Sequence, residues 1–359
     1  MRRGLMAWDP EEIPIDTLRQ RIGRLQSAMG AAGQDAILLY TNFVRSGAVS
    51  YLTAFSPYWA DGVLLVPREG EPVFATTLSK RVGSWIQSVK PIGGLVTSPT
   101  PGTVLGQKLA AGGGIRRLAI LELDNFPSGL YGEIEAALPG TEIVDGSETF
   151  AAARRHLDDV ERRLLAKAQS IAQGALDRLP FDITTDVGSA VGAVEEYARL
   201  QGAEEVYVAI AADLDSDRRF VRLSGNRPLG RRFAIRATVA YKGAWVRQTK
   251  TFSKDDKDRL PIARADARFR TFAASIDEKF SLRDQVAAGF ADLAGTQLVG
   301  WMAEAAVGTH PLAVVASSEK PTETRKHVAG LIVTLGLTID GVPWCGAGLA
   351  GLAQGNSSP

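Results

Sequence analysis

Hydrophobic and polar residues alternate along Phe233–Tyr241, which is the period of a half-buried β-strand. Lys242 and Gly243 follow as a natural two-residue turn, and residues 244–252 continue as a second arm. The pattern therefore predicts a β-hairpin over residues 233–252.

This hairpin brings two arginines together. The turn places Arg236 opposite Thr249 and Arg247 opposite Thr238, so the two arginines become diagonal neighbours on one face. Two guanidinium groups about 7–8 Å apart at the backbone repel each other unless solvent or an anion lies between them. The pair indicates either a solvated face, where most charged residues lie, or a site for an acidic ligand or a carboxylate partner.

Helical and strand-like periods alternate through the first part of the chain. Thr17–Met29 has apolar residues at helical spacing, and Asp35–Tyr40 has the pattern of a buried strand followed by a loop. Further strands are expected at residues 62–67, 72–75 and 118–122, and further helices at 79–89, 104–111 and 129–138. This alternation predicts a compact α/β domain over residues 1–153.

The pattern changes in the second part of the chain. A long amphipathic helix is expected at Asp158–Leu179, a second at Asp186–Leu200, and a helical pattern covers most of Arg264–Gly289, with the hairpin between them. Strands and helices that do not strictly alternate are typical of an antiparallel-sheet α+β domain, here residues 154–359. The polar tail 353–359 is expected to fray.

Charge and composition limit the partners and the cellular compartment that we expect for this protein. With 359 residues, 41 basic against 40 acidic side chains and a net charge of +1, no global field attracts nucleic acid or an anionic membrane. The longest apolar run, Ala329–Ile339, is far shorter than the roughly 18–20 residues of a membrane span. The lone Cys345 excludes an internal disulfide framework. We therefore expect a soluble, cytoplasmic protein with neither nucleic acid nor membrane as partner.

Three stretches resemble the creatinase/prolidase/aminopeptidase P family. Arg21–Tyr40 and Val49–Phe55 are similar to the opening of the family's N-terminal domain, and Arg154–Leu176 is similar to the entry helix of its catalytic domain. Their order and spacing extend over nearly the whole chain. The resemblance implies an α/β N-terminal domain, an α+β pita-bread domain with the site cleft, and a homodimer in which Tyr58 and Trp59 are candidate lid residues that contact substrate.

The resemblance also shows where metal ligands would stand. The family's two metal-binding aspartates fall on Arg236 and Arg247, its histidine falls on His310, and its first glutamate falls on Gly336. No counterpart of the fifth ligand is found after residue 341. A divalent ion needs carboxylate or imidazole ligands and is repelled by permanent cations, so we expect no metal and no cofactor.

The family's substrate-side histidine falls near Phe220 or Val221, so it is also missing and Phe220 becomes a substrate-binding candidate. His310 remains as a candidate general acid or base, although a lone histidine in a Gly/Pro turn is often structural. Glu319 is the accompanying catalytic candidate, with Glu323 as its alternative and a surface carboxylate as the simpler interpretation of either.

Further candidates adjoin the hairpin. Tyr241 and Trp245 could contact substrate beside Arg236 and Arg247, or could simply pack. The preceding segment 218–232 is rich in arginine, which indicates either a solvated loop or a cationic pocket for a carboxylate or phosphate.

Two hypotheses from different classes follow. The first is a metal-independent pita-bread enzyme, a hydrolase or lyase acting at a C–N bond of a small carboxylate-bearing, amino-acid-like or peptide-like molecule. Arg236 and Arg247 would hold the acid, and His310 would transfer a proton. The alternative is a catalytically inactive peptidase homologue that binds a small molecule, peptide or protein partner.

Overall fold

The chain folds as two compact units, one ending at Arg155 and the other beginning at His156. The computed structural model describes residues 8–42, 44–55, 60–113, 115–179, 186–277, 280–319 and 330–351. Tyr58, Trp59, Glu323 and the tail 353–359, which the sequence singled out, lie outside these residues.

The N-terminal unit contains a mixed six-stranded sheet in the order β4-β3-β2-β1-β5-β6. Its central strand β1 runs antiparallel to β2 and parallel to β5. The strands are β1 (Ala36–Thr41), β2 (Gly62–Pro67), β3 (Val73–Thr76), β4 (Gly94–Thr97), β5 (Arg117–Ile120) and β6 (Glu142–Asp145). The helices are α1 (Ile15–Ala31), α2 (Gly47–Thr53), η1 (Lys80–Val82), α3 (Gly83–Val89), α4 (Pro101–Ala111), η2 (Leu123–Asn125), α5 (Ser128–Ala137) and α6 (Ser147–Ala153).

Burial explains why this unit is compact. Nearly every residue of β1 and β2 is buried, as expected for strands covered on both faces. One face packs on α4 and α5 through a cluster that includes Leu38, Leu65, Leu105 and Ile134. The α/β architecture predicted for this part of the chain is confirmed.

The C-terminal unit is built on a seven-stranded sheet in the order β11-β10-β12-β13-β9-β8-β7. Each neighbouring pair is antiparallel. The strands are β7 (Glu205–Ala211), β8 (Arg232–Tyr241), β9 (Ala244–Ser253), β10 (Thr296–Ala305), β11 (Val314–Ser317), β12 (Leu331–Ile339) and β13 (Val342–Ala350). This agrees with the predicted α+β class.

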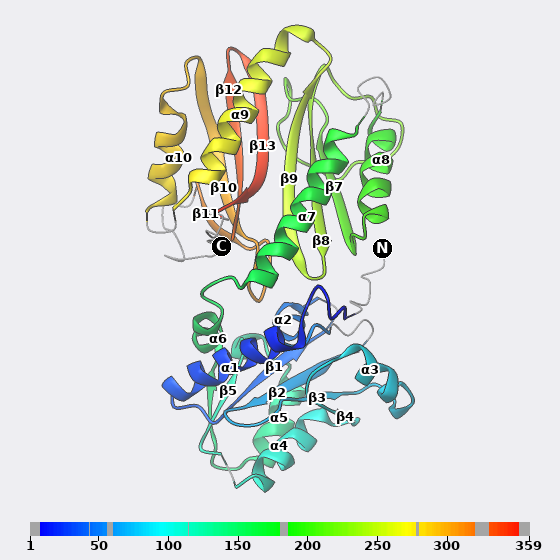
Figure 1. Cartoon of the computed structure of the whole chain (residues 1–359), viewed down its shortest axis with the longest axis vertical. Helices are drawn as coiled ribbons and strands as arrows, with labels where there is room; N and C mark the ends of the chain where they lie inside the picture. Colours follow the sequence, from blue (N-terminus) through cyan, green and yellow to red (C-terminus); the bar gives the residue numbers. More distant parts are fainter. Residues whose placement is uncertain are drawn as a thin grey trace. The chain divides into compact units, whose positions relative to one another are not determined.

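Helices cover one face of this sheet (Figure 1). They are α7 (Asp159–Asp177), α8 (Val187–Leu200), η3 (Asp256–Asp258), α9 (Arg259–Ser275) and α10 (Leu282–Ala291). α7 begins with a capping box in which Asp158 and Glu161 satisfy each other's backbone N–H groups. Its apolar side packs with α8 against β7 and β8, while α9 and α10 pack against β10, β12 and β13.

The sequence patterns predicted some elements and missed others. The hairpin is confirmed in its register, with Arg236 opposite Thr249 and Thr238 opposite Arg247. The helical pattern over residues 264–289 is interrupted, because Ile276 leaves α9 with extended backbone angles and Ser281 caps the separate helix α10. The helix α2, expected as loop, was not predicted, and neither were helix α6 and the strands β4, β6, β7 and β10 to β13.

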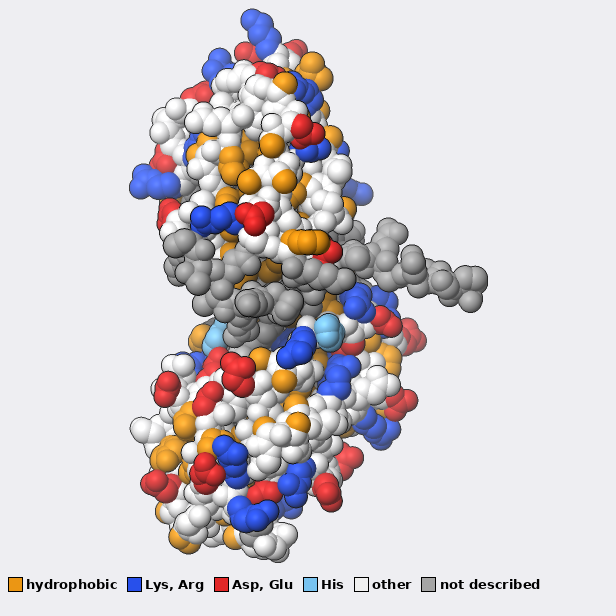
Figure 2. All heavy atoms as spheres, turned by 90° about the vertical axis from the view of Figure 1, so that its left-hand side faces the viewer, with side chains coloured by type: hydrophobic (Ala, Val, Ile, Leu, Met, Phe, Trp, Pro, Cys, Tyr) orange, Lys and Arg blue, Asp and Glu red, His pale blue; other side chains and the backbone are white. Residues whose placement is uncertain are grey.

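Surface charge is mixed on the face seen in Figure 2, where acidic and basic side chains are interspersed on both units. This agrees with the near-neutral net charge of the chain. Within the described residues, every helix is too short or too polar to cross a lipid bilayer.

Candidate functional site

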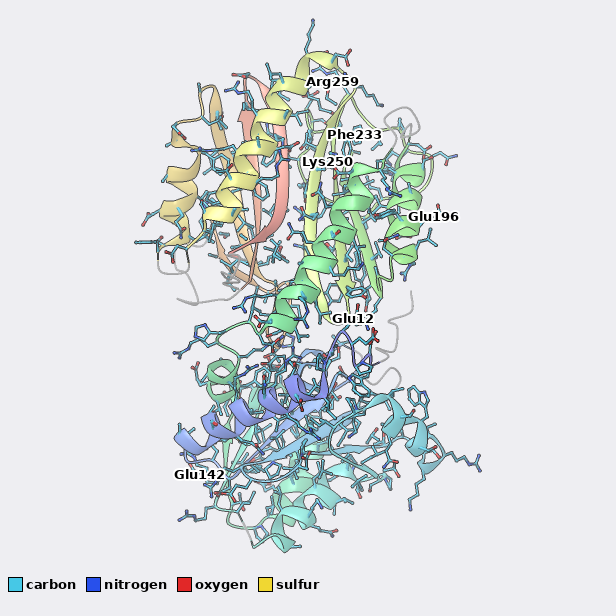
Figure 3. All side chains as sticks on the ribbon, viewed as in Figure 1. Glu12, Glu142, Glu196, Phe233, Lys250 and Arg259 are labelled. Carbon is cyan, nitrogen blue, oxygen red and sulfur yellow. The ribbon has the colours of Figure 1, made fainter. Side chains whose placement is uncertain are left out.

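The two faces of the C-terminal sheet have different characters because successive residues of a strand point to opposite sides. On β8, Phe233, Ile235 and Val239 join the core beneath α7 and α8. Arg236 and Thr238 therefore point to the other face, which we call the helix-free face. Phe233 and Lys250, both labelled in Figure 3, lie on the helix-covered side, where the Lys250 ammonium pairs with Asp177 of α7 at 2.5 Å.

Arg247 has a buried carboxylate partner on this face. Its guanidinium forms a short ion pair with Glu304, whose side chain is only 4% exposed, and its Nε donates to Thr238 at 3.2 Å. The register of the sheet brings this pair together, because Arg247, Leu349, Ile332 and Glu304 occupy one row across β9, β13, β12 and β10. A carboxylate partner, one of the two possibilities raised for the arginine pair, is present for Arg247.

Arg236 makes fewer contacts. Its Nε donates to Thr249 at 3.3 Å, and its guanidinium lies 3.9 Å from the centre of the Phe220 ring. Burial, and secondarily the charge of Arg247, lower the pKa of Arg236 to about 10, which leaves it protonated at neutral pH. Among the described residues Arg236 has no ion pair, in contrast to Arg247 with Glu304.

A third arginine reaches the same face from the loop after β7. Arg218 donates to the backbone oxygen of Leu337 at 3.2 Å and to the hydroxyl of Thr338 at 2.9 Å. Cys345, opposite Gly336 on the neighbouring strand, is buried in a small cluster against which Phe220 packs. Burial raises the pKa of this thiol, against the opposing charges of Arg218 and Arg236.

Aromatic side chains lie next to the arginines toward the hairpin turn. Tyr207 and Trp245 stack with their ring centres 6.0 Å apart, and the Arg222 guanidinium lies 4.9 Å from the centre of the Tyr207 ring. Trp245 is two residues from Arg247 on the same strand and the same face, which corresponds to about 7 Å along the sheet. The helix-free face thus presents cations beside a flat aromatic surface.

Glu304 is unusual because a carboxylate is held in such a buried place. Burial raises its pKa above the ordinary value, while the charges of Arg247 and Arg236 act in the opposite direction. Sequence reasoning missed Glu304. The signal was the alternation in β10, where Trp301 and Ala303 join the core and Glu304 must face the other side.

The predicted site residues are not all brought together. Trp245 and Phe220 lie beside the arginines, as described above. Tyr241 packs against the core beneath α7 and α8, which is the opposite face of the sheet from Arg236, because the two residues are an odd number of positions apart. His310 lies in the loop between β10 and β11, Glu319 follows β11, and both are exposed. Their catalytic roles stay predictions.

Other parts of the described chain are weaker candidates for a functional site. No group of three or more His, Cys, Asp and Glu side chains there could hold a metal ion. A cavity of about 340 Å³ in the N-terminal unit is lined by charges of both signs, among them Asp35, Glu69 and Lys108. Asp35 is already bonded to the backbone N–H groups of Arg116 and Arg117, so it serves the fold.

Comparison with known proteins identifies the architecture. Residues 21–156 match the family model of the Creatinase/Prolidase N-terminal domain. The N-terminal domain belongs to this family. No curated protein matches the sequence.

Solved structures extend the likeness to the C-terminal domain. The Xaa-Pro dipeptidase from Bacillus anthracis has a TM-score of 0.66 at 19% identity over 93% of each chain. The X-Pro aminopeptidase from Thermotoga maritima has a TM-score of 0.68 at 15% identity, covering 92% of this chain and 96% of that one. The prolidase from Pyrococcus horikoshii has a TM-score of 0.64 at 15% identity, covering 92% and 93%. The chain therefore has the pita-bread fold of these peptidases, as its sequence led us to expect.

Proposed function

We propose that this pita-bread protein is an enzyme that binds a small carboxylate-bearing, amino-acid-like or peptide-like molecule on its helix-free face and breaks a C–N bond by hydrolysis or elimination. The observation that supports this most is Arg236, a half-buried cation without an ion pair among the described residues. A buried charge is costly unless it is compensated, and a carboxylate ligand would compensate it.

We propose further that the reaction does not use a pair of divalent metal ions. Among the residues that the structure describes, the charged side chains gathered here are Arg236, Arg247, Arg218 and the carboxylate of Glu304, which is already committed to Arg247. Such a set does not suit a dication, because permanent cations repel it and the remaining oxygen donors are hydroxyl groups. His310 remains the proposed proton-transfer group, with Glu319 as the second candidate.

The alternative is an inactive peptidase homologue that keeps the fold and binds a ligand. The replacement of the family's carboxylate positions by Arg236 and Arg247 favours it, since the two-metal chemistry of a peptidase is lost with them. Turnover separates the two proposals. Release of amine from a panel of dipeptides and N-acyl amino acids, lost in His310→Ala but not in a folded control, would support the enzyme.

Binding tests the site itself. N-acetylglycine is a minimal probe with one carboxylate and one C–N bond, and its affinity can be measured by calorimetry. Arg236→Gln should weaken binding about 10- to 100-fold, as expected when a charge-assisted hydrogen bond is removed. Arg219→Gln is the matched control, because Arg219 is 83% exposed and pairs with Asp217. Equal affinity in the two variants would exclude Arg236 as the anchor.

A further inference from the structure

The charges on the helix-free face do not balance. Arg218, Arg236 and Arg247 are positive, and Glu304 compensates one of them by pairing with Arg247. Cys345 stays neutral because burial raises the pKa of its thiol. The described residues of this region therefore carry two positive charges more than negative ones.

The other charged groups nearby are engaged with partners of their own. Near the hairpin turn the carboxylate of Glu205 accepts a hydrogen bond from Tyr207, and Arg222 lies over the same ring, so these two charges offset each other. The acids in the loop that carries Arg218 are engaged within it or with nearby arginines: Asp213 with Ser216, Asp215 with Arg231 and Arg232, and Asp217 with Arg219.

The two uncompensated cations are separated in space. Arg236 lies over Phe220 on the β8 side, while Arg218 is fixed to Thr338 on β12. Cys345 on β13 lies between them and is influenced by both charges. Gly336 faces Cys345, and a Cβ atom added at this glycine would meet no atom nearer than 3.8 Å. Gly336 and Cys345 thus lie on the sheet between two cationic positions, and Phe220 packs against the cluster that contains Cys345.

We propose that the ligand carries two carboxylates, one bound by Arg236 and the other by Arg218. This inference rests on the proposed function and names its ligand class as an acidic amino-acid-like molecule or another dicarboxylate. Two separated cations match two separated negative charges better than one compact dianion, because each carboxylate can then accept from its own guanidinium.

We expect the protein to bind a dicarboxylate much more tightly than a monocarboxylate. A second ion pair in a partly buried setting, with charges about 4–6 Å apart and an effective dielectric near 20, favours the dicarboxylate by at least about tenfold. Calorimetry would compare butyrate with malonate, succinate, glutarate and adipate at fixed ionic strength, with inorganic phosphate as the compact dianion.

We expect at least one dicarboxylate to bind tenfold or more tighter than butyrate and tighter than phosphate. Arg218→Gln should abolish this preference, so that the dicarboxylate binds no tighter than butyrate. Arg218→Lys keeps the charge and should keep most of the preference. Arg219→Gln, one residue away and exposed, should keep all of it. Thermal unfolding of each variant would verify that it is folded.

The possible outcomes distinguish a failure of the dicarboxylate inference from a failure of the proposed function. If butyrate and all dicarboxylates bind equally and Arg236→Gln weakens the binding of all of them, the proposed carboxylate site at Arg236 is supported. The inference of a second carboxylate bound by Arg218 is then wrong. If phosphate binds tightest, the ligand is a compact dianion and the two-carboxylate assignment is overturned. If no carboxylate binds to the wild-type protein, the proposed function fails and the inference with it.

Discussion

At the residue scale, the carboxylate of Glu304, which is far from the hairpin in sequence, explains how Arg247 can be buried. Glu304 and Arg247 are both largely buried, with side chains 4% and 17% exposed. Replacing such a pair by apolar residues is often tolerated, whereas removing one partner leaves an uncompensated charge. The pair is therefore coupled, and neither member can be interpreted alone.

Glu304→Gln should destabilise the C-terminal unit by about 3–5 kcal/mol, because Arg247 would be left buried without its carboxylate. The double variant Glu304→Leu with Arg247→Met should recover most of that loss. Urea unfolding of Glu304→Leu, Arg247→Met and the double variant gives the coupling energy. Arg259→Gln is the control, since Arg259 and Asp256 form an exposed pair expected to contribute less than about 1 kcal/mol. Equal effects of Glu304→Gln and Arg259→Gln would contradict the burial argument.

The ion pair between Arg247 and Glu304 could not have been predicted from the sequence. The register of the hairpin follows from Lys242, Gly243 and the alternation around them, so the neighbourhood of Arg236 and Arg247 was predictable. Glu304 reaches Arg247 only after β12 and β13 have been inserted between β10 and β9. Strand order is a property of the assembled sheet, and no local pattern in the chain encodes it.

At the element scale, the hairpin turn is stabilised from the neighbouring strand. Lys242 and Gly243 both have positive φ angles, 46° and 79°, as a tight hairpin turn requires. The carboxylate of Glu204, just before β7, accepts from the backbone N–H of Gly243 at 3.4 Å. Burial raises the pKa of Glu204 from 4.5 to about 7, although the backbone N–H groups of the turn act against this.

This shift should make stability depend on pH. The folded protein holds the Glu204 proton up to about pH 7, whereas the unfolded chain releases it near 4.5. The contribution to stability is complete below about pH 4.5 and is lost as the pH rises to 7. Glu204→Gln should remove this slope, and Glu196→Gln, an exposed glutamate of α8, should retain it. Melting temperatures from pH 4.5 to 7.5 would measure both, and parallel curves for wild type and Glu204→Gln would refute the assignment.

At the scale of the whole molecule, each unit has its own sheet and its own core. The N-terminal core between its sheet, α4 and α5 uses only residues of that unit, and the two clusters beneath α7 to α10 use only residues after His156. A unit that closes its own core can fold alone. The homodimer implied by the family resemblance stays a prediction.

Residues 8–155 expressed alone should therefore unfold cooperatively in a single transition. The physical reason is that β1 and β2 are buried by helices of the same unit. Circular dichroism during urea titration would measure the transition, and amide exchange would show whether β1 is protected. A fragment without protected amides in β1 would show that this unit depends on the rest of the chain.

The sequence by itself determined the local features: the helices with a strong period, the hairpin and its register, the α/β opening domain and the likeness to creatinase and prolidase. These depend on residues close together in the chain, where spacing alone sets which side chains share a face. Only the tertiary structure decided that Glu304 joins Arg247 and that Arg218 and Arg236 lie on either side of Cys345. Those relations depend on the order of strands that are far apart in sequence, and this order is fixed by the packing of the whole sheet against its helices.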